Sequence, residues 1–140
     1  MSTDPNCIFC KIVAGNAPAD ILFQNEELIV FRDIKPESKH HFLVVPKKHI
    51  LNVNSLQTNE DKLLVERMVE IGKKILAEHN GDIDDARLGF HCPPFNSINH
   101  LHLHVISPVS EMGFIKRQVF RPNTWWFQSV DDTLLRLSKL

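Results

Sequence analysis

The sequence predicts an α+β protein, in which an antiparallel sheet of about five strands carries one long helix and a short C-terminal helix. Three observations predict this fold class. Short apolar segments alternate with turn-forming residues over most of the chain. One segment, 58–80, places apolar residues at helical spacing. Another, HLHLHVI at 100–106, alternates imidazoles with apolar residues, which is typical of a strand with one buried face.

The first half of the chain predicts a short helix and three strands. The helix could form at 7–14, CIFCKIVA. Residues 20–33, DILFQNEELIVFRD, predict a hairpin, because two apolar segments flank the turn-forming residues 25–27. Residues 41–46, HFLVVP, predict a buried strand that Pro46 ends.

The long helix is predicted at 58–80, where it would cover the sheet. Thr58 can cap its start, and Gly81 can supply a left-handed residue after its end. Its apolar stripe consists of Leu64, Met68, Ile71 and Ile75.

Two more strands and a helix are predicted in the second half. Residues 86–92, ARLGFHC, and 100–106 form the strands, and the loop PPFNS at 93–97 joins them. Short connections of this kind favour antiparallel pairing. A final amphipathic helix would follow Ser129, which could cap it.

The length of 140 residues predicts a single domain over 1–140, with a core at about 7–110 and a tail at 111–140. A hydrophobic content of 43% and a charged content of 24% are ordinary for a soluble globular protein. The formal net charge of −1 gives no global attraction to nucleic acid or membranes. No apolar run approaches the roughly 20 residues that span a bilayer.

The N-terminus, MSTDPNCIFCK, lacks a basic region followed by an apolar stretch, so no signal peptide is predicted. The chain has 3 cysteines, two of them in a Cys-x-x-Cys pair, which argues against a disulfide scaffold. We therefore expect a reducing compartment, the cytoplasm and/or the nucleus.

The run at 100–106 carries the strongest functional signal. In a strand, His100, His102 and His104 would share one face, roughly 7 Å apart along the strand. With 8 histidines in the chain, this spacing should arise by chance roughly 0.03 times. The imidazoles could simply face solvent, chelate a metal, or act in catalysis as nucleophile, acid or base, because histidine titrates near neutral pH.

Three adjacent imidazoles suit attack on phosphorus. A neutral imidazole is a competent nucleophile and would form a phosphohistidine intermediate. Its neighbours can supply the acid for the leaving group and donors for the phosphate oxygens. Because close imidazoles oppose each other's protonation, at least one should stay neutral at pH 7. This chemistry requires no metal.

HLHLHVI resembles the signature of the histidine triad superfamily. CIFCKIVAG and VFRDIKPESKHHFLVVPKKHI resemble its nucleotide-binding branch, and the similarity covers about 7–110. GFHCPPFNSINHLHLHVISP and the WWF tail are most similar to its aprataxin-like members. The resemblance implies the histidine triad fold and a homodimer.

The resemblance also implies an activity: hydrolysis of nucleoside (adenosine) 5'-phosphoramidates or acyl-AMP, with release of AMP. His102 would attack the α-phosphate of the purine nucleotide, and a nucleotidyl-histidine intermediate would form. His104 would bond the phosphate, and His100 would orient His102. Alternatives are an aprataxin-like DNA-adenylate hydrolase, a dinucleoside polyphosphate hydrolase, and a non-enzymatic nucleotide-binding adaptor.

The nucleotide-binding residues follow from the same resemblance. Asp33 matches a ribose-binding carboxylate, and Ser97 matches a hydroxyl near the scissile bond. His91 stands near the place where many relatives have asparagine, which puts that contact in question. The residues that would sandwich the base are Phe9, Phe31 and Ile34. From the residues alone, Asp33 could be a turn former, Ser97 could bond the backbone, and the phenylalanines could belong to the core.

Cys7 and Cys10 have metal-ligand spacing, and His49 and His100 are candidate partners in a Cys2His2 set. Some relatives with the same opening resemble a zinc-bound form, so a structural zinc is implied. The alternatives are two small core residues or a redox pair.

Other polar residues receive simpler interpretations. His40, His41 and His79 are expected to be solvated or locally bonded. In the tail, basic residues interleave with aromatic ones, as in a nucleic-acid surface. A tail packed on its own domain or on a second subunit explains the pattern better, so nucleic acid is not expected as a partner. The basic residues concerned are Lys116, Arg117 and Arg121.

Overall fold

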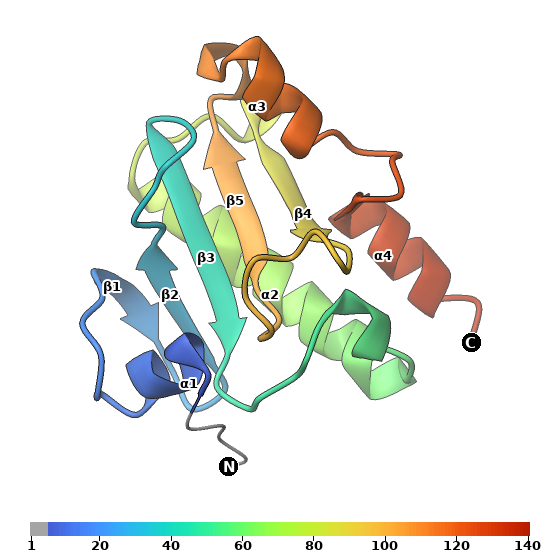
Figure 1. The fold of residues 1–140 in the computed structure, drawn as a ribbon. Helices are drawn as coiled ribbons and strands as arrows, with labels where there is room; N and C mark the ends of the chain where they lie inside the picture. Colours follow the sequence, from blue (N-terminus) through green and yellow to red (C-terminus); the bar gives the residue numbers. More distant parts are fainter. Residues whose placement is uncertain (1–5) are drawn as a thin grey trace.

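The computed structural model describes residues 6–140 (Figure 1). Its strands are β1 (Ile21–Gln24), β2 (Leu28–Arg32), β3 (His40–Pro46), β4 (Arg87–His91), β5 (Leu103–Ser107) and β6 (Phe127–Ser129). Its helices are α1 (Ile8–Val13), α2 (Asn59–Glu78), α3 (Phe114–Val119) and α4 (Val130–Leu137). The predicted α+β class is therefore confirmed. Over the described residues, no helix has the length and apolarity needed to cross a membrane.

The strands form one antiparallel sheet in the order β1-β2-β3-β5-β4-β6. Alternation along β3 divides its side chains between two apolar clusters. Phe42 and Val44 face α2, whereas Leu43 and Val45 face α1. The long helix thus covers one face of the sheet and the short N-terminal helix covers part of the other (Figure 1). His104 of β5 pairs with Leu43 and therefore lies on the α1 side.

Helix α2 begins as predicted and ends differently. The Thr58 side chain accepts from the Asp61 N–H at 3.1 Å, and the Asp61 carboxylate accepts from the Thr58 N–H at 2.9 Å. The predicted left-handed Gly81 is wrong, because Asn80 takes that conformation with φ 61°. Gly81 serves close packing instead. A Cβ there would lie 2.1 Å from Cδ1 of Leu76.

Three further details correct the sequence analysis. The sheet has six strands rather than about five, because the three-residue β6 pairs with β4. Helix α3 was not predicted. Strand β5 begins at Leu103, so His100 and His102 lie before it, although Leu101 still packs in the α2-side core. The predicted final helix is confirmed, and Ser129 Oγ accepts from the Asp132 N–H at 3.1 Å.

Candidate active site

His102 is held in the tautomer that a nucleophile needs. Its Nδ1 lies 2.7 Å from the carbonyl oxygen of His100. Because a carbonyl can only accept, Nδ1 carries the proton and the lone pair is at Nε2. Burial lowers the pKa of His102, more than the His100 carbonyl raises it. The imidazole is therefore neutral and nucleophilic at neutral pH.

His104 has a partner that sequence analysis missed. Nε2 of His41 lies 2.9 Å from Nδ1 of His104. On the other side of the His41 ring, the Glu37 N–H donates to Nδ1 at 3.1 Å. His41 therefore carries its proton on Nε2 and donates it to His104. The expectation that His41 is solvated or only locally bonded was wrong, because β3 and β5 pair and bring the two imidazoles to the same face.

This arrangement leaves a free donor at the site. With Nδ1 of His104 accepting, its proton is on Nε2. That buried Nε2 has no hydrogen-bond partner among the described residues. Burial holds the pKa of His104 well below 6.5, and the neighbouring imidazoles lower it further. A buried N–H without a partner is costly, so an acceptor such as a phosphate oxygen would bind there favourably.

Asp33 joins the same cluster. Its Oδ2 lies 3.4 Å from Nε2 of His41, and its Oδ1 accepts from the Lys35 N–H at 2.8 Å. The carboxylate is partly accessible, with 20% of the side chain exposed. It therefore acts as a turn former, as one interpretation predicted, and still offers oxygen lone pairs beside the imidazoles.

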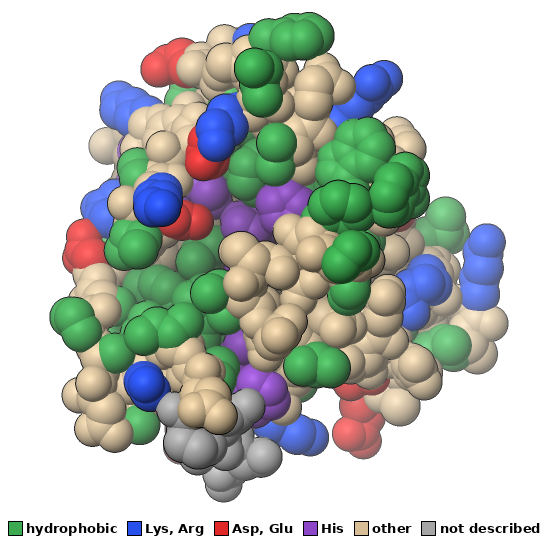
Figure 2. Space-filling view, in the orientation of Figure 1, with side chains coloured by type: hydrophobic (Ala, Val, Ile, Leu, Met, Phe, Trp, Pro, Cys, Tyr) green, Lys and Arg blue, Asp and Glu red, His purple; other side chains and the backbone are tan. Residues whose placement is uncertain are grey.

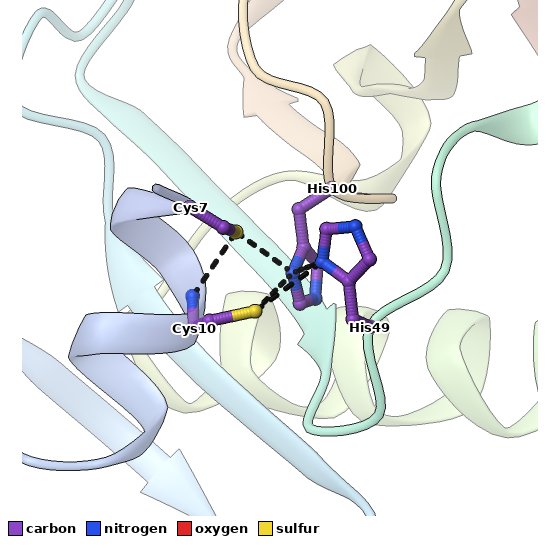
Figure 3. Close-up of side chains that lie close together, drawn as sticks. All are labelled: Cys7, Cys10, His49 and His100. Carbon is purple, nitrogen blue, oxygen red and sulfur yellow. Dashed lines mark hydrogen bonds between the residues drawn. The ribbon is translucent and has the colours of Figure 1, made fainter. Parts of the chain in front are cut away.

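The predicted Cys2His2 set is assembled beside the triad (Figure 3). Cys7 and Cys10 come from the start of α1, His49 from the segment after β3, and His100 from the segment before β5. Their four ligand atoms lie within 4.8 Å of one another. Burial raises the pKa of the Cys7 thiol and lowers that of His100 to about 4.

The donor chemistry of the set fits a tetrahedral metal. Nε2 of His100 donates to the Pro46 carbonyl at 2.8 Å, so its Nδ1 is free to coordinate. That Nδ1 lies 3.1 Å from Nδ1 of His49 and 3.3 Å from Sγ of Cys7. Such close lone pairs need a proton or a cation between them, and two sulfurs with two imidazoles are ligands that Zn²⁺ prefers.

Comparison with known proteins identifies the family. The family model described as "Scavenger mRNA decapping enzyme C-term binding" matches residues 6–120. The chain is 50% identical over 140 residues to adenosine 5'-monophosphoramidase HINT3 of Mus musculus, covering 97% of this chain and 84% of that protein. The chain belongs to the histidine triad family.

Two further matches agree. The protein of the same name from Xenopus tropicalis is 44% identical over 138 residues, covering 97% of this chain and 90% of its own. A solved histidine triad protein from Clostridium difficile is similar with a TM-score of 0.69 and 28% identity, covering 75% of this chain and 92% of that one. The predicted family membership and fold are thus confirmed.

The structure places the expected base-binding residues of this histidine triad protein in different environments. Phe9 and Phe31 are buried with ring centroids 5.3 Å apart, and Phe9 also contacts His102 at 5.2 Å. Both rings belong to the α1-side core, as the simpler interpretation had it. Ile34 is 90% exposed in the loop after β2. Ile34 is therefore open to contact from solvent, whereas the two rings are covered by the α1-side core.

His91 ends β4, and Ser97 lies in the loop between β4 and the triad. Ser97 is exposed. His91, at the end of β4, contacts the His104 ring at 5.0 Å and bonds the Val119 carbonyl through Nε2 at 2.9 Å. Burial lowers the pKa of His91. His91 is therefore part of the imidazole cluster, although its ring faces the tail.

The tail supplies a wall that sequence analysis did not predict. Phe120 is buried, and its ring centroid lies 4.7 Å from that of His91, 5.1 Å from that of His104 and 5.8 Å from that of His41. Figure 2 shows histidine side chains gathered near the centre of this face, with hydrophobic side chains on both sides. The sequence predicted a tail packed on its own domain or on a second subunit, but not its position over the imidazoles.

Proposed function

We propose that this protein is a nucleotide hydrolase that cleaves adenosine 5'-phosphoramidates or acyl-AMP and releases AMP. One observation carries the proposal. His102 has its proton fixed on Nδ1 by the His100 carbonyl, which leaves Nε2 as a neutral nucleophile. The names of the two relatives support the substrate class, because both are adenosine 5'-monophosphoramidases.

The reaction would proceed in two displacements. Nε2 of His102 attacks the α-phosphorus, the bond from phosphorus to the amine nitrogen or acyl oxygen breaks, and the leaving group takes the electron pair. An amine leaving group also takes a proton from solvent, and the water that attacks in the second displacement returns one. Nε2–H of His104 donates to a phosphate oxygen as charge develops there. Water then attacks the nucleotidyl-histidine, and AMP leaves with the water oxygen while His102 returns to its neutral form.

The nucleotide would lie between the imidazoles and the loop after β2. Asp33 is the proposed acceptor for the ribose hydroxyls, and Ile34 the contact for a face of the purine. Phe9 and Phe31 would lie behind the base, and Ser97 would lie near the leaving group. His91 would lie beside the phosphate. The support is the contact of Phe9 with His102, of His91 with His104 and of Asp33 with His41.

A structural zinc would be held by Cys7, Cys10, His49 and His100. It would supply a fixed cross-link between α1, the segment after β3 and the triad. We assign it no part in bond breaking. We further propose that the protein acts as a homodimer in a reducing compartment, the cytoplasm or the nucleus, where free thiols persist.

The test is AMP release from adenosine 5'-phosphoramidate by the purified protein and by His102→Ala. Loss of the nucleophile should reduce kcat by about four orders of magnitude or more. A matched control is His79→Asn, because His79 lies at the end of α2 and bonds the Ile75 carbonyl. Turnover retained by His102→Ala would exclude the covalent route. AMP binding without turnover in the wild-type protein would favour the adaptor instead.

A second substrate should be included because of the tail. Trp125 is 72% exposed and its ring lies 5.0 Å from that of Phe95, which is also exposed. Exposed aromatic pairs near basic residues can stack on bases. Faster release of AMP from an adenylated DNA end than from the phosphoramidate would place this protein with the aprataxin-like hydrolases.

A further inference from the structure

His100 takes part in two systems at once. Its side chain is one of the four groups of the Cys2His2 set, and its backbone carbonyl holds the Nδ1 proton of His102. The residue is fully buried. Any displacement of the His100 side chain that rotates its backbone therefore changes the bond that fixes the His102 tautomer.

The sheet does not hold this segment. The pairing of β3 with β5 ends at Val44 and Leu103, so His100 and His102 lie beyond the regular ladder. Two hydrogen bonds hold it instead, one to the last residue of β3 and one to the segment after β3. The Leu101 N–H donates to the Ile50 carbonyl at 2.7 Å, and Nε2 of His100 donates to the Pro46 carbonyl at 2.8 Å.

The Cys2His2 set adds a third attachment. Sγ of Cys7 and Sγ of Cys10 lie 3.3 Å and 3.5 Å from Nδ1 of His100. His49, on the same segment as Ile50, lies 3.1 Å from that nitrogen and 3.2 Å from Sγ of Cys10. A cation at the centre would join α1, the segment after β3 and the segment before β5 at one point (Figure 3).

We propose that a thiophilic divalent cation of the Zn²⁺ class, bound by the Cys2His2 set, positions the nucleophile through His100. The bound cation fixes the His100 side chain, so the backbone carbonyl of His100 stays aligned with Nδ1 of His102. Nε2 of His102 then keeps its lone pair for attack. His100 is thus a positioning residue with two functions, and the thiols of α1 act on catalysis from outside the reacting atoms. The effect on turnover rests on the function proposed above, whereas the effect on the tautomer does not.

The expected consequence is a loss of rate without a loss of substrate affinity. Without the cation, His102 would exchange between its two tautomers, and only one of them has Nε2 free. Loss of one aligned hydrogen bond corresponds to roughly a tenfold change. We expect the metal-free protein to show kcat lower by about 10-fold with KM little changed.

The experiment compares metal-loaded and chelator-treated full-length protein, with Zn²⁺ as the added ion. The direct readout is the ¹⁵N NMR pattern of the His102 ring, which distinguishes a proton on Nδ1 from a proton on Nε2. The loaded protein should show a single Nδ1–H form and the metal-free protein a mixture. Steady-state kinetics on adenosine 5'-phosphoramidate give kcat and KM for the same samples.

Cys7→Ser is the sharpest variant. Cys7 caps α1 by accepting from the Cys10 N–H at 3.2 Å, and serine is a good cap that lacks the thiolate. It should bind Zn²⁺ more weakly and behave like the metal-free protein while keeping α1. Cys10→Ser is the second variant if Cys7→Ser fails to fold. Cys92→Ala is the control, because Cys92 is a buried thiol outside the set.

The outcomes separate the two proposals. Stoichiometric Zn²⁺ with an unchanged His102 tautomer after its removal would make the metal merely structural and overturn the inference. Failure to bind one Zn²⁺ per chain would overturn it as well. If the tautomer responds to Zn²⁺ but no phosphoramidate turnover is found in either state, the positioning stands and the proposed function fails.

Discussion

Nε2 of His41 donates a hydrogen bond to Nδ1 of His104 over 2.9 Å, and this contact leaves the His104 proton on Nε2. The Glu37 N–H fixes one end of this series of hydrogen bonds by donating to Nδ1 of His41. The other end is Nε2–H of His104, which is buried without a partner among the described residues. His41 therefore keeps the proton of His104 on Nε2, the donor that we propose for a phosphate oxygen.

His41→Asn should lower kcat while leaving KM nearly unchanged. The shorter side chain would not reach His104, so the His104 proton could move to Nδ1 and the donor for the phosphate would be lost for part of the time. We expect a decrease in kcat of about 10-fold or more, the rate equivalent of one hydrogen bond made in the transition state. Steady-state kinetics on adenosine 5'-phosphoramidate measure it.

The matched control is His40→Asn. His40 is the preceding residue of β3 and points to the opposite side, where its ring packs 5.8 Å from Phe42. Its replacement should change stability more than kcat. Equal losses of kcat in the two variants would mean that β3, rather than the contact of His41 with His104, carries the effect.

The free energy of unfolding should decrease as the pH falls through the range of the buried imidazoles. Burial lowers the pKa of His41 from 6.5 to about 4, and it also lowers the pKa of His102 and of His104. Because these folded-state pKa values lie below the unfolded ones, the unfolded chain binds more protons between them. Stability should be constant above about pH 7 and be lost progressively from about pH 6.5 toward 4.

Urea unfolding at a series of pH values tests this dependence. His41→Asn removes one such imidazole, so its stability should depend less steeply on pH over the same range. A free energy of unfolding that stays constant between about pH 7 and 5 would show that the imidazoles gain protons without penalty, and thus that water reaches them.

Phe120→Ala should move the pH profile of the reaction. The Phe120 ring covers His41, His91 and His104, and burial is the main cause of their lowered pKa values. Its removal admits water, so these pKa values should rise toward 6.5 and the acid limb of kcat/KM should shift to higher pH. The variant should also be less stable by about 3 kcal/mol or more.

Two further variants isolate the effect of Phe120. Phe120→Leu keeps an apolar cover and should leave the pH profile in place. Phe114→Ala, in the same tail, replaces a side chain that is 78% exposed and should change neither property. A folded Phe120→Ala protein with the original acid limb would contradict the assignment of Phe120 as the cover of the imidazoles.

The predictable part of the fold is the part with local patterns. Thr58 and Ser129 are caps that the sequence displays, and the hairpin of β1 and β2 follows from its turn residues. The Cys2His2 set was predicted from a short spacing together with the family resemblance. The structure brings its four residues together because the topology places α1 beside the segments that flank β3 and β5.

The missed features depend on contacts distant in sequence. Strand β6 has only three residues and exists because β4 offers it an edge, which no local pattern indicates. The partnership of His41 with His104 spans 63 positions and needs the register of β3 and β5. Phe120 could be predicted to be buried somewhere, but its position over the imidazoles depends on the path of the whole tail.

Gly89→Ala should detach the tail from the sheet and thereby weaken the site. Gly89 pairs with His104 on one side and Ser129 on the other. A Cβ there would lie 2.5 Å from Cζ of Phe127 and 2.6 Å from the Gln128 carbonyl oxygen, so β6 must move. Because Phe127 packs against His91 and Phe120, that movement should loosen the wall beside His104. We expect a loss of stability of about 1–3 kcal/mol and a lower kcat.

Gly113→Ala is the control, since a Cβ at Gly113 would meet no atom within 4 Å. Thermal unfolding and turnover of the two variants decide the matter, and equal behaviour would mean that β6 accommodates the methyl group without disturbing the imidazoles.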